Sequence, residues 1–174
     1  MWSSDRERML RTALCHAAAI AAITVIASCG FHLRGDVTYA FNTLYLNSPP
    51  AVPLTAELKR AIQGAAGARL MDTPTAADVV LDVTGLVDDK QVLSLSGGGR
   101  VREFLLVKRV TIAVHDSNGR DWLPASEVQV RRSYTFNEAE VLAREAQEAR
   151  LLKEMQTDVV QQIVRRLQAA RAPA

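Results

Sequence analysis

This chain contains few cysteines and few aromatic residues, and its net charge is low. The 174 residues include two cysteines, Cys15 and Cys29. Cys15 lies within an apolar run, residues 13–25, which is too short to span a bilayer comfortably as a permanent helix and is typical of a cleaved signal sequence. The mature chain then keeps Cys29 alone, which excludes an internal disulfide and any metal site built from cysteines.

The low aromatic content and low charge exclude further classes. Aromatic residues make up 5% of the chain, too few to expect a stacking platform for bases or sugars. The formal net charge is +2, and loss of residues 1–28 removes three arginines and two acidic residues, which leaves about +1. Such a chain does not bind nucleic acid through bulk charge, so affinity for an acidic ligand must come from locally placed basic side chains.

The clearest motif is a bacterial lipobox at the end of the apolar run, Ile26-Ala27-Ser28-Cys29. Small residues before the cysteine let the extended chain enter a peptidase cleft, and the cysteine thiol can be acylated with diacylglycerol before cleavage. We therefore interpret residues 1–28 as a lipoprotein signal peptide and Cys29 as a mature N-terminus that carries a diacylglycerol group and an N-acyl chain. Two or more acyl chains anchor a protein stably.

Two alternatives concern this segment. The first is an ordinary secretory peptide followed by an incidental cysteine. The second is a start at Met9 instead of Met1, which leaves the mature protein unchanged. Gly30, and not aspartate, follows the cysteine. In Gram-negative cells this is expected of lipoproteins that are passed on to the outer membrane.

The mature chain, 146 residues long, fits one domain with a core of its own. We expect residues 29–40 to form a lipidated tether and residues 41–174 to form the domain. Apolar spacing predicts the element order β-α-β-β-β-α, in which hairpins link the middle strands. The predicted elements are strand 41–47, helix 54–66, strand 77–89 with a second run over 91–96, strand 101–114, strand 126–136 and helix 138–171. This order predicts an α/β (α+β) two-layer sandwich, with an about four-stranded mixed sheet covered on one face by two helices.

Two glycine-containing segments are predicted to be turns. Residues 97–99 are three glycines, but the lysine and hydroxyl residue of a phosphate-binding loop do not follow, so a hairpin tip is the better interpretation. Asn118-Gly119 predicts a tight turn before the last strand. The preceding residues, His115-Asp116-Ser117, have the side-chain types of a hydrolytic triad. Adjacent residues of a strand cannot converge on one another, however, and we expect a turn-capping role.

The last predicted helix carries an apolar stripe at three- and four-residue spacing, which we expect to cover the sheet and not to bind a partner. The stripe consists of Leu142, Ala146, Ala149, Leu152, Met155, Val159, Ile163 and Leu167. We expect Trp122 to anchor the core or its rim as well.

The string Cys29-Gly30-Phe31-His32-Leu33-Arg34-Gly35 directly follows the lipobox. This string, the most specific match, and the predicted element order resemble the LptE family of lipopolysaccharide-assembly lipoproteins. Weaker matches follow in the same order along the chain, at residues 99–104, 130–136, 142–144, 155–158 and 161–167.

The resemblance implies a protein that is not an enzyme. Proteins of this family lie within the lumen of the outer-membrane β-barrel LptD as a 1:1 heterodimer, help it to fold, plug it, and bind lipopolysaccharide on its way to the cell surface. The implied location is the outer membrane, with the lipid anchor on the periplasmic face. In the family, basic residues at one end of the sandwich are thought to meet the phosphorylated lipid, which makes Arg100, Arg102 and Arg144 the candidates. No basic residue precedes Gly99 in the glycine tip, so binding residues do not transfer one to one.

Two other functions are compatible with parts of the sequence. An auxiliary lipoprotein of a lipid-transporting ABC system can share the anchor and a small α/β domain. A tethered periplasmic hydrolase needs a nucleophile, a base and an orienting group, whereas the mature chain has only His32 and His115 as histidines. We expect no metal site and no cofactor other than the lipids on Cys29.

Overall fold

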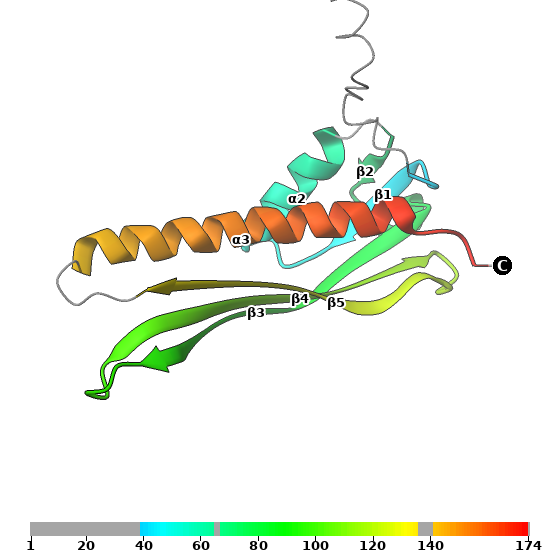
Figure 1. Cartoon of the computed structure of the whole chain (residues 1–174). Helices are drawn as coiled ribbons and strands as arrows, with labels where there is room; N and C mark the ends of the chain where they lie inside the picture. Colours follow the sequence, from blue (N-terminus) through cyan, green and yellow to red (C-terminus); the bar gives the residue numbers. More distant parts are fainter. Residues whose placement is uncertain (1–38, 65–66, 136–140, 174) are drawn as a thin grey trace, which may run out of the picture. The chain divides into compact units, whose positions relative to one another are not determined.

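The computed structural model describes residues 39–64, 67–135 and 141–173 (Figure 1). These residues contain a five-stranded sheet in the order β2-β1-β3-β4-β5. The strands are β1 (Thr43–Asn47), β2 (Arg69–Met71), β3 (Val79–Leu95), β4 (Val101–Asp116) and β5 (Asp121–Thr135). β1 pairs in parallel with both β2 and β3, whereas β4 pairs antiparallel with both β3 and β5.

Two helices, α2 (Pro53–Gly64) and α3 (Val141–Ala169), cover one face of this sheet (Figure 1). The helices contact each other through Glu57, whose carboxylate accepts hydrogen bonds from Gln156 Nε2 (2.6 Å) and Thr157 Oγ1 (2.7 Å). Side chains from both helices and from β1, β3 and β4 meet between the layers, and each large aliphatic one contributes about 1.5–3 kcal/mol by its burial. Fully buried members include Leu44, Leu58, Ile62, Leu81, Ile112, Met155, Ile163 and Leu167.

The two-layer α+β fold with a mixed sheet and two helices is the predicted one, but the sequence pattern missed β2. This strand has three residues, too few to show an alternation of apolar and polar side chains. The two predicted runs at 77–89 and 91–96 are a single strand, β3. The charged run Asp88-Asp89-Lys90 divides the apolar pattern in the sequence, although these residues pair with β4 like the rest of the strand.

The prediction that the apolar stripe of α3 covers the sheet is wrong for part of the stripe. Met155, Val159, Ile163 and Leu167 are buried as expected, but Ala146 and Ala149 are exposed. The sheet does reach this segment, because Glu148 between the two alanines bonds to Lys90 of β3 and Tyr134 of β5. Ala146 and Ala149 therefore lie on a side of the helix that the sheet does not cover.

The core begins earlier than the predicted domain boundary at residue 41. Tyr39 is 7% exposed, and its ring stacks on Phe41 with the ring centroids 5.1 Å apart. Phe41 in turn meets Trp122 edge to face at 6.0 Å. The half-buried Trp122 thus packs against the core, which confirms the prediction of an anchor at the core or its rim.

Both β-hairpins close through turns of the same geometry. In the turn between β3 and β4, the N–H of Ser96 donates to the carbonyl of Arg100 (2.7 Å), and that of Gly99 donates to the carbonyl of Ser96 (2.9 Å). In the turn between β4 and β5, Asp116 takes the place of Ser96, and its carboxylate also accepts hydrogen bonds from the N–H groups of Asn118 (2.8 Å) and Arg120 (3.0 Å). These bonds hold the pKa of Asp116 below its usual range. The predicted turns and the predicted capping role are confirmed, with Asp116 as the capping residue.

Candidate functional site

Arg100 directly follows the glycine tip, Arg102 is the second residue of β4, and both are exposed. Val101 between them is paired with Leu95 of β3. A Cβ atom added to Gly97, Gly98 or Gly99 would meet no other atom within 4 Å, so there is open space at these three positions. The structure therefore places two exposed arginines at the outer end of a long hairpin.

Arg144 belongs to the first turns of α3, and its side chain lies outside the described part of the structure. Cys29, the predicted signal peptide 1–28 and most of the tether 29–40 also lie outside it. Their assignments remain predictions from the sequence.

Sequence reasoning missed an apolar surface beside the two arginines. Among the described residues, the large apolar side chains that are most exposed are Val87 (41%), Val92 (52%), Leu93 (49%) and Leu95 (57%), and all of them belong to β3. β1 pairs with β3 only from Val79 to Asp82, so the rest of this strand edge has no neighbouring strand in the described part of the chain. The run 91–96 is the part of the sequence that signals this surface. Its pattern predicts a strand, but the prediction does not identify that strand as an edge of the sheet.

A cluster of four side chains links the hairpin to α3. Lys90 Nζ pairs with Glu148 Oε2 at 2.5 Å and lies 4.5 Å from the ring centroid of Phe104, while the Tyr134 hydroxyl donates to Glu148 Oε2 at 2.5 Å. The hydrogen bond from Lys90, followed by that from Tyr134, lowers the pKa of Glu148. The bond to Glu148 raises the pKa of Lys90, and burial raises that of Tyr134. This arrangement stabilises the charged forms of both Lys90 and Glu148 and joins strand to helix.

His115 lies on the other face of the sheet, opposite the helices. Its Nε2 is 3.1 Å from Asp82 Oδ2, and its Nδ1 is 2.9 Å from the carbonyl oxygen of Asp116. Asn47 donates to the same Asp82 carboxylate at 2.6 Å. Both ring nitrogens are thus engaged, and the contacts of His115 and Asp82 join β1, β3 and β4.

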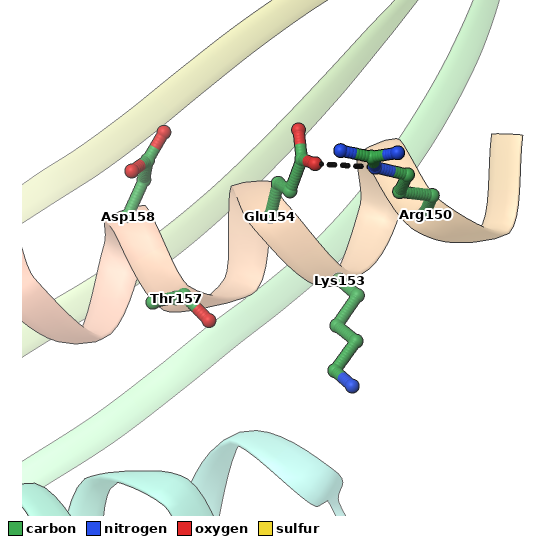
Figure 2. A pocket seen from close by; sticks show the side chains of 5 residues that line it. All are labelled: Arg150, Lys153, Glu154, Thr157 and Asp158. Atoms are coloured by element: carbon green, nitrogen blue, oxygen red, sulfur yellow. Dashed lines mark hydrogen bonds and ion pairs between the residues drawn. The ribbon is translucent and has the colours of Figure 1, made fainter. Parts of the chain in front are cut away.

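Two depressions lie on the surface of the described residues. The one in Figure 2 has a volume of about 390 Å³ and is lined by α3 alone. Its charged groups are largely paired, Arg150 with Glu154 at 2.9 Å and Asp158 with Arg132 at 2.5 Å. Figure 2 shows Arg150, Glu154 and Asp158 on one side of the helix and Lys153 on the other, so they do not converge on a common point.

The second depression, about 170 Å³, lies where α2 begins against β3 and β4. Most of its lining is aliphatic, and Lys108 at its edge is paired with Asp88. It is smaller than the sites that normally hold a small-molecule ligand. Neither depression combines space with convergent reactive groups.

No group of histidine, cysteine, aspartate or glutamate side chains in the described part of the chain is arranged to hold a metal ion. Within the same residues, no helix has the length and apolar character needed to cross a membrane.

Comparison with known proteins supplies the family. A family model described as lipopolysaccharide-assembly matches residues 41–167. The chain is 31% identical over 150 residues to the LPS-assembly lipoprotein LptE of Pectobacterium atrosepticum, covering 84% of this chain and 80% of that protein. It is also 31% identical to the protein of the same name from Yersinia enterocolitica, covering 84% and 71%.

Solved structures agree with these relatives. A lipoprotein B from Nitrosomonas europaea superposes with a TM-score of 0.71 at 33% identity, covering 80% of this chain and 91% of that one. The rare lipoprotein B of Shewanella oneidensis has the same fold, with a TM-score of 0.65 at 22% identity, covering 74% and 95%. The match of the family model to the whole folded domain and the identity to curated relatives lead to one conclusion: the chain belongs to the LptE lipopolysaccharide-assembly family.

Proposed function

We propose that this protein is an outer-membrane lipoprotein that takes part in lipopolysaccharide assembly by binding and plugging an LptD-like β-barrel as a 1:1 heterodimer. The observation that carries the proposal is the family match over residues 41–167, which spans all five strands and nearly all of α3. The names of the curated relatives describe lipoproteins of lipopolysaccharide assembly. The lipobox at Ile26 to Cys29 agrees with that description.

In this proposal Cys29 carries the diacylglycerol and N-acyl chains that hold the protein on the periplasmic face of the outer membrane, while the domain occupies the barrel lumen. Two or more chains are needed because burial of each methylene contributes about 0.8 kcal/mol and one chain gives only reversible attachment.

We further propose that the protein binds lipopolysaccharide through Arg100 and Arg102, with Arg144 as a third candidate. Lipopolysaccharide carries phosphate groups, and the planar guanidinium group can donate two parallel hydrogen bonds to phosphate oxygens. The exposed position of both arginines at a hairpin end supports this role. No catalytic function is proposed, because the reactive groups in the described part of the chain, such as His115, are engaged in structural contacts.

The second candidate is an auxiliary lipoprotein of a lipid-transporting ABC system. The family match favours the first proposal, and the two differ in the partner that each requires. The test is affinity purification of the tagged full-length protein from detergent-solubilised envelopes, followed by mass spectrometry of the bound proteins. We expect a near-equimolar outer-membrane barrel. An inner-membrane ATPase complex in its place would overturn the assignment.

A further inference from the structure

In the described part of the chain, three of the four most exposed large apolar side chains lie at one end of the β3–β4 hairpin. Val92, Leu93 and Leu95 are each about half exposed, and they occupy the last residues of β3 before the glycine tip. The pairing of β3 with β4 shifts register between Val92 and Ser94, so Leu93 lies in a β-bulge and has no paired residue on β4. The three side chains therefore form one exposed apolar surface at the end of the strand.

Basic groups lie immediately beside this surface. Leu95 is paired with Val101, which Arg100 and Arg102 flank in the chain. Residues 92–104 contain these two arginines and a single acidic residue, Glu103. The hairpin end therefore combines apolar contact area with an excess of positive charge, which complements a ligand that carries both phosphate groups and hydrocarbon.

A protein strand added to the open edge of β3 is the rival occupant. The edge is unsuited to it at this end, because the pairing of β3 with β4 shifts register between Val92 and Ser94 and again between Ser94 and Leu95. Bulges of this kind twist an edge and interrupt the regular row of backbone donors and acceptors that an added strand requires. Hydrocarbon chains have no such requirement.

We propose that Val92, Leu93 and Leu95 bind the acyl chains of a phosphorylated, acylated glycolipid while Arg100 and Arg102 bind its phosphate groups. This inference rests on the proposed binding of lipopolysaccharide and adds to it a subsite for the hydrocarbon part of the ligand. The arginines then select for phosphate, and the apolar side chains distinguish the acylated ligand from its deacylated form.

The test compares three variants of the full-length protein with the unmodified chain. The apolar variant carries Val92→Ser, Leu93→Ser and Leu95→Ser, and the arginine variant carries Arg100→Gln and Arg102→Gln. Val87→Ser is the matched control, because Val87 is also an exposed valine of β3 but lies farther from the arginines. The probes are purified lipopolysaccharide and its fully deacylated form, which keeps the phosphates. Circular dichroism verifies that each variant is folded.

We expect the apolar variant to bind lipopolysaccharide at least about tenfold more weakly, because losing the burial of two methylene groups already changes affinity by this factor. Its affinity for the deacylated probe should be unchanged, whereas the arginine variant should bind both probes more weakly. Val87→Ser should behave like the unmodified protein.

Two results would overturn the subsite. One is unchanged lipopolysaccharide affinity of the folded apolar variant while the arginine variant is weakened, which would leave the proposed function intact. The other is a photo-crosslinking residue at position 93 that captures a protein segment and not the glycolipid in intact envelopes. Failure of the barrel to co-purify would instead contradict the proposed function. This failure can be distinguished from failure of the subsite, because the binding assay does not contain the barrel.

Discussion

At the scale of single residues, Glu148 connects the hairpin to the long helix. It accepts hydrogen bonds from Lys90 of β3, 58 residues away in the sequence, and from Tyr134 of β5, 14 residues away. Lys90 also lies over the ring of Phe104, so a cation–π contact supports the ion pair. Since Ala146 and Ala149 of the same helix segment are exposed, this polar cluster supplies attachment that apolar packing does not provide there.

The pKa of Glu148 is lowered in the folded state, which fixes how its contribution depends on pH. A carboxyl group with a lowered pKa stabilises the fold above its unfolded pKa of about 4.3, and this stability is lost as the pH falls through the folded pKa. The raised pKa of Lys90 acts at the alkaline end, where its contribution disappears as the pH rises through its folded pKa.

We predict that Glu148→Gln lowers the free energy of unfolding at neutral pH by roughly 1 kcal/mol, because a partly solvated ion pair and one hydrogen bond are lost. The difference from the unmodified protein should shrink as the pH falls below about 4. Urea denaturation at several pH values measures it, with the exposed Glu145→Gln as control on the same helix. A difference that stays constant down to acid pH would show that charge is not its source.

At the scale of elements, the hairpin between β3 and β4 depends on one of its three glycines. Gly99 has a φ of +75°, in the left-handed region that a side chain disfavours. Gly97 and Gly98 do not have a positive φ, and a Cβ atom at either position would meet nothing within 4 Å. The turn therefore requires glycine at only one of these three positions.

We predict that Gly99→Ala destabilises the domain by about 1 kcal/mol, because the left-handed conformation strains a residue with a Cβ atom. Gly98→Ala should leave stability unchanged or raise it by roughly 0.4–1 kcal/mol, since alanine restricts the unfolded chain. Thermal denaturation of the two single variants, otherwise identical, measures the difference. Equal destabilisation by both would mean that the conformation of Gly99 is not what the turn depends on.

At the scale of the whole molecule, attachment to the membrane and folding of the domain are expected to be separable. The predicted anchor is at Cys29, whereas the first buried core residue in the described part is Tyr39. No helix in that part could hold the protein in a bilayer by spanning it.

We predict that Cys29→Ala leaves a folded domain but abolishes retention in the membrane, because the acyl chains can no longer be attached. Fractionation of washed membranes measures retention, and circular dichroism of the released protein measures folding. If the variant remained in the washed membranes as before, the lipid anchor would not be what holds the protein there.

The sequence by itself determined the features that depend on neighbours along the chain. The spacing of apolar residues predicted both helices, the turn signals at Gly97–Gly99 and Asn118-Gly119 predicted two hairpins, and the string from Cys29 to Gly35 indicated the family. Each of these signals is local, because helix faces, strand alternation and turn conformations are set within a few residues.

Only the tertiary structure decided the features that depend on distant segments. The three residues of β2 form a strand because β1 lies beside them, and Ala146 and Ala149 are exposed because they lie on a side of α3 that the sheet does not cover. Likewise, Leu93 and Leu95 are of a residue type that is usually buried, but both are exposed. The pairing of β1 with β3 ends before it reaches them, and no described strand takes the place of β1 at that edge. Sequence spacing tells which side chains share a face, whereas contacts between remote segments decide whether that face is buried.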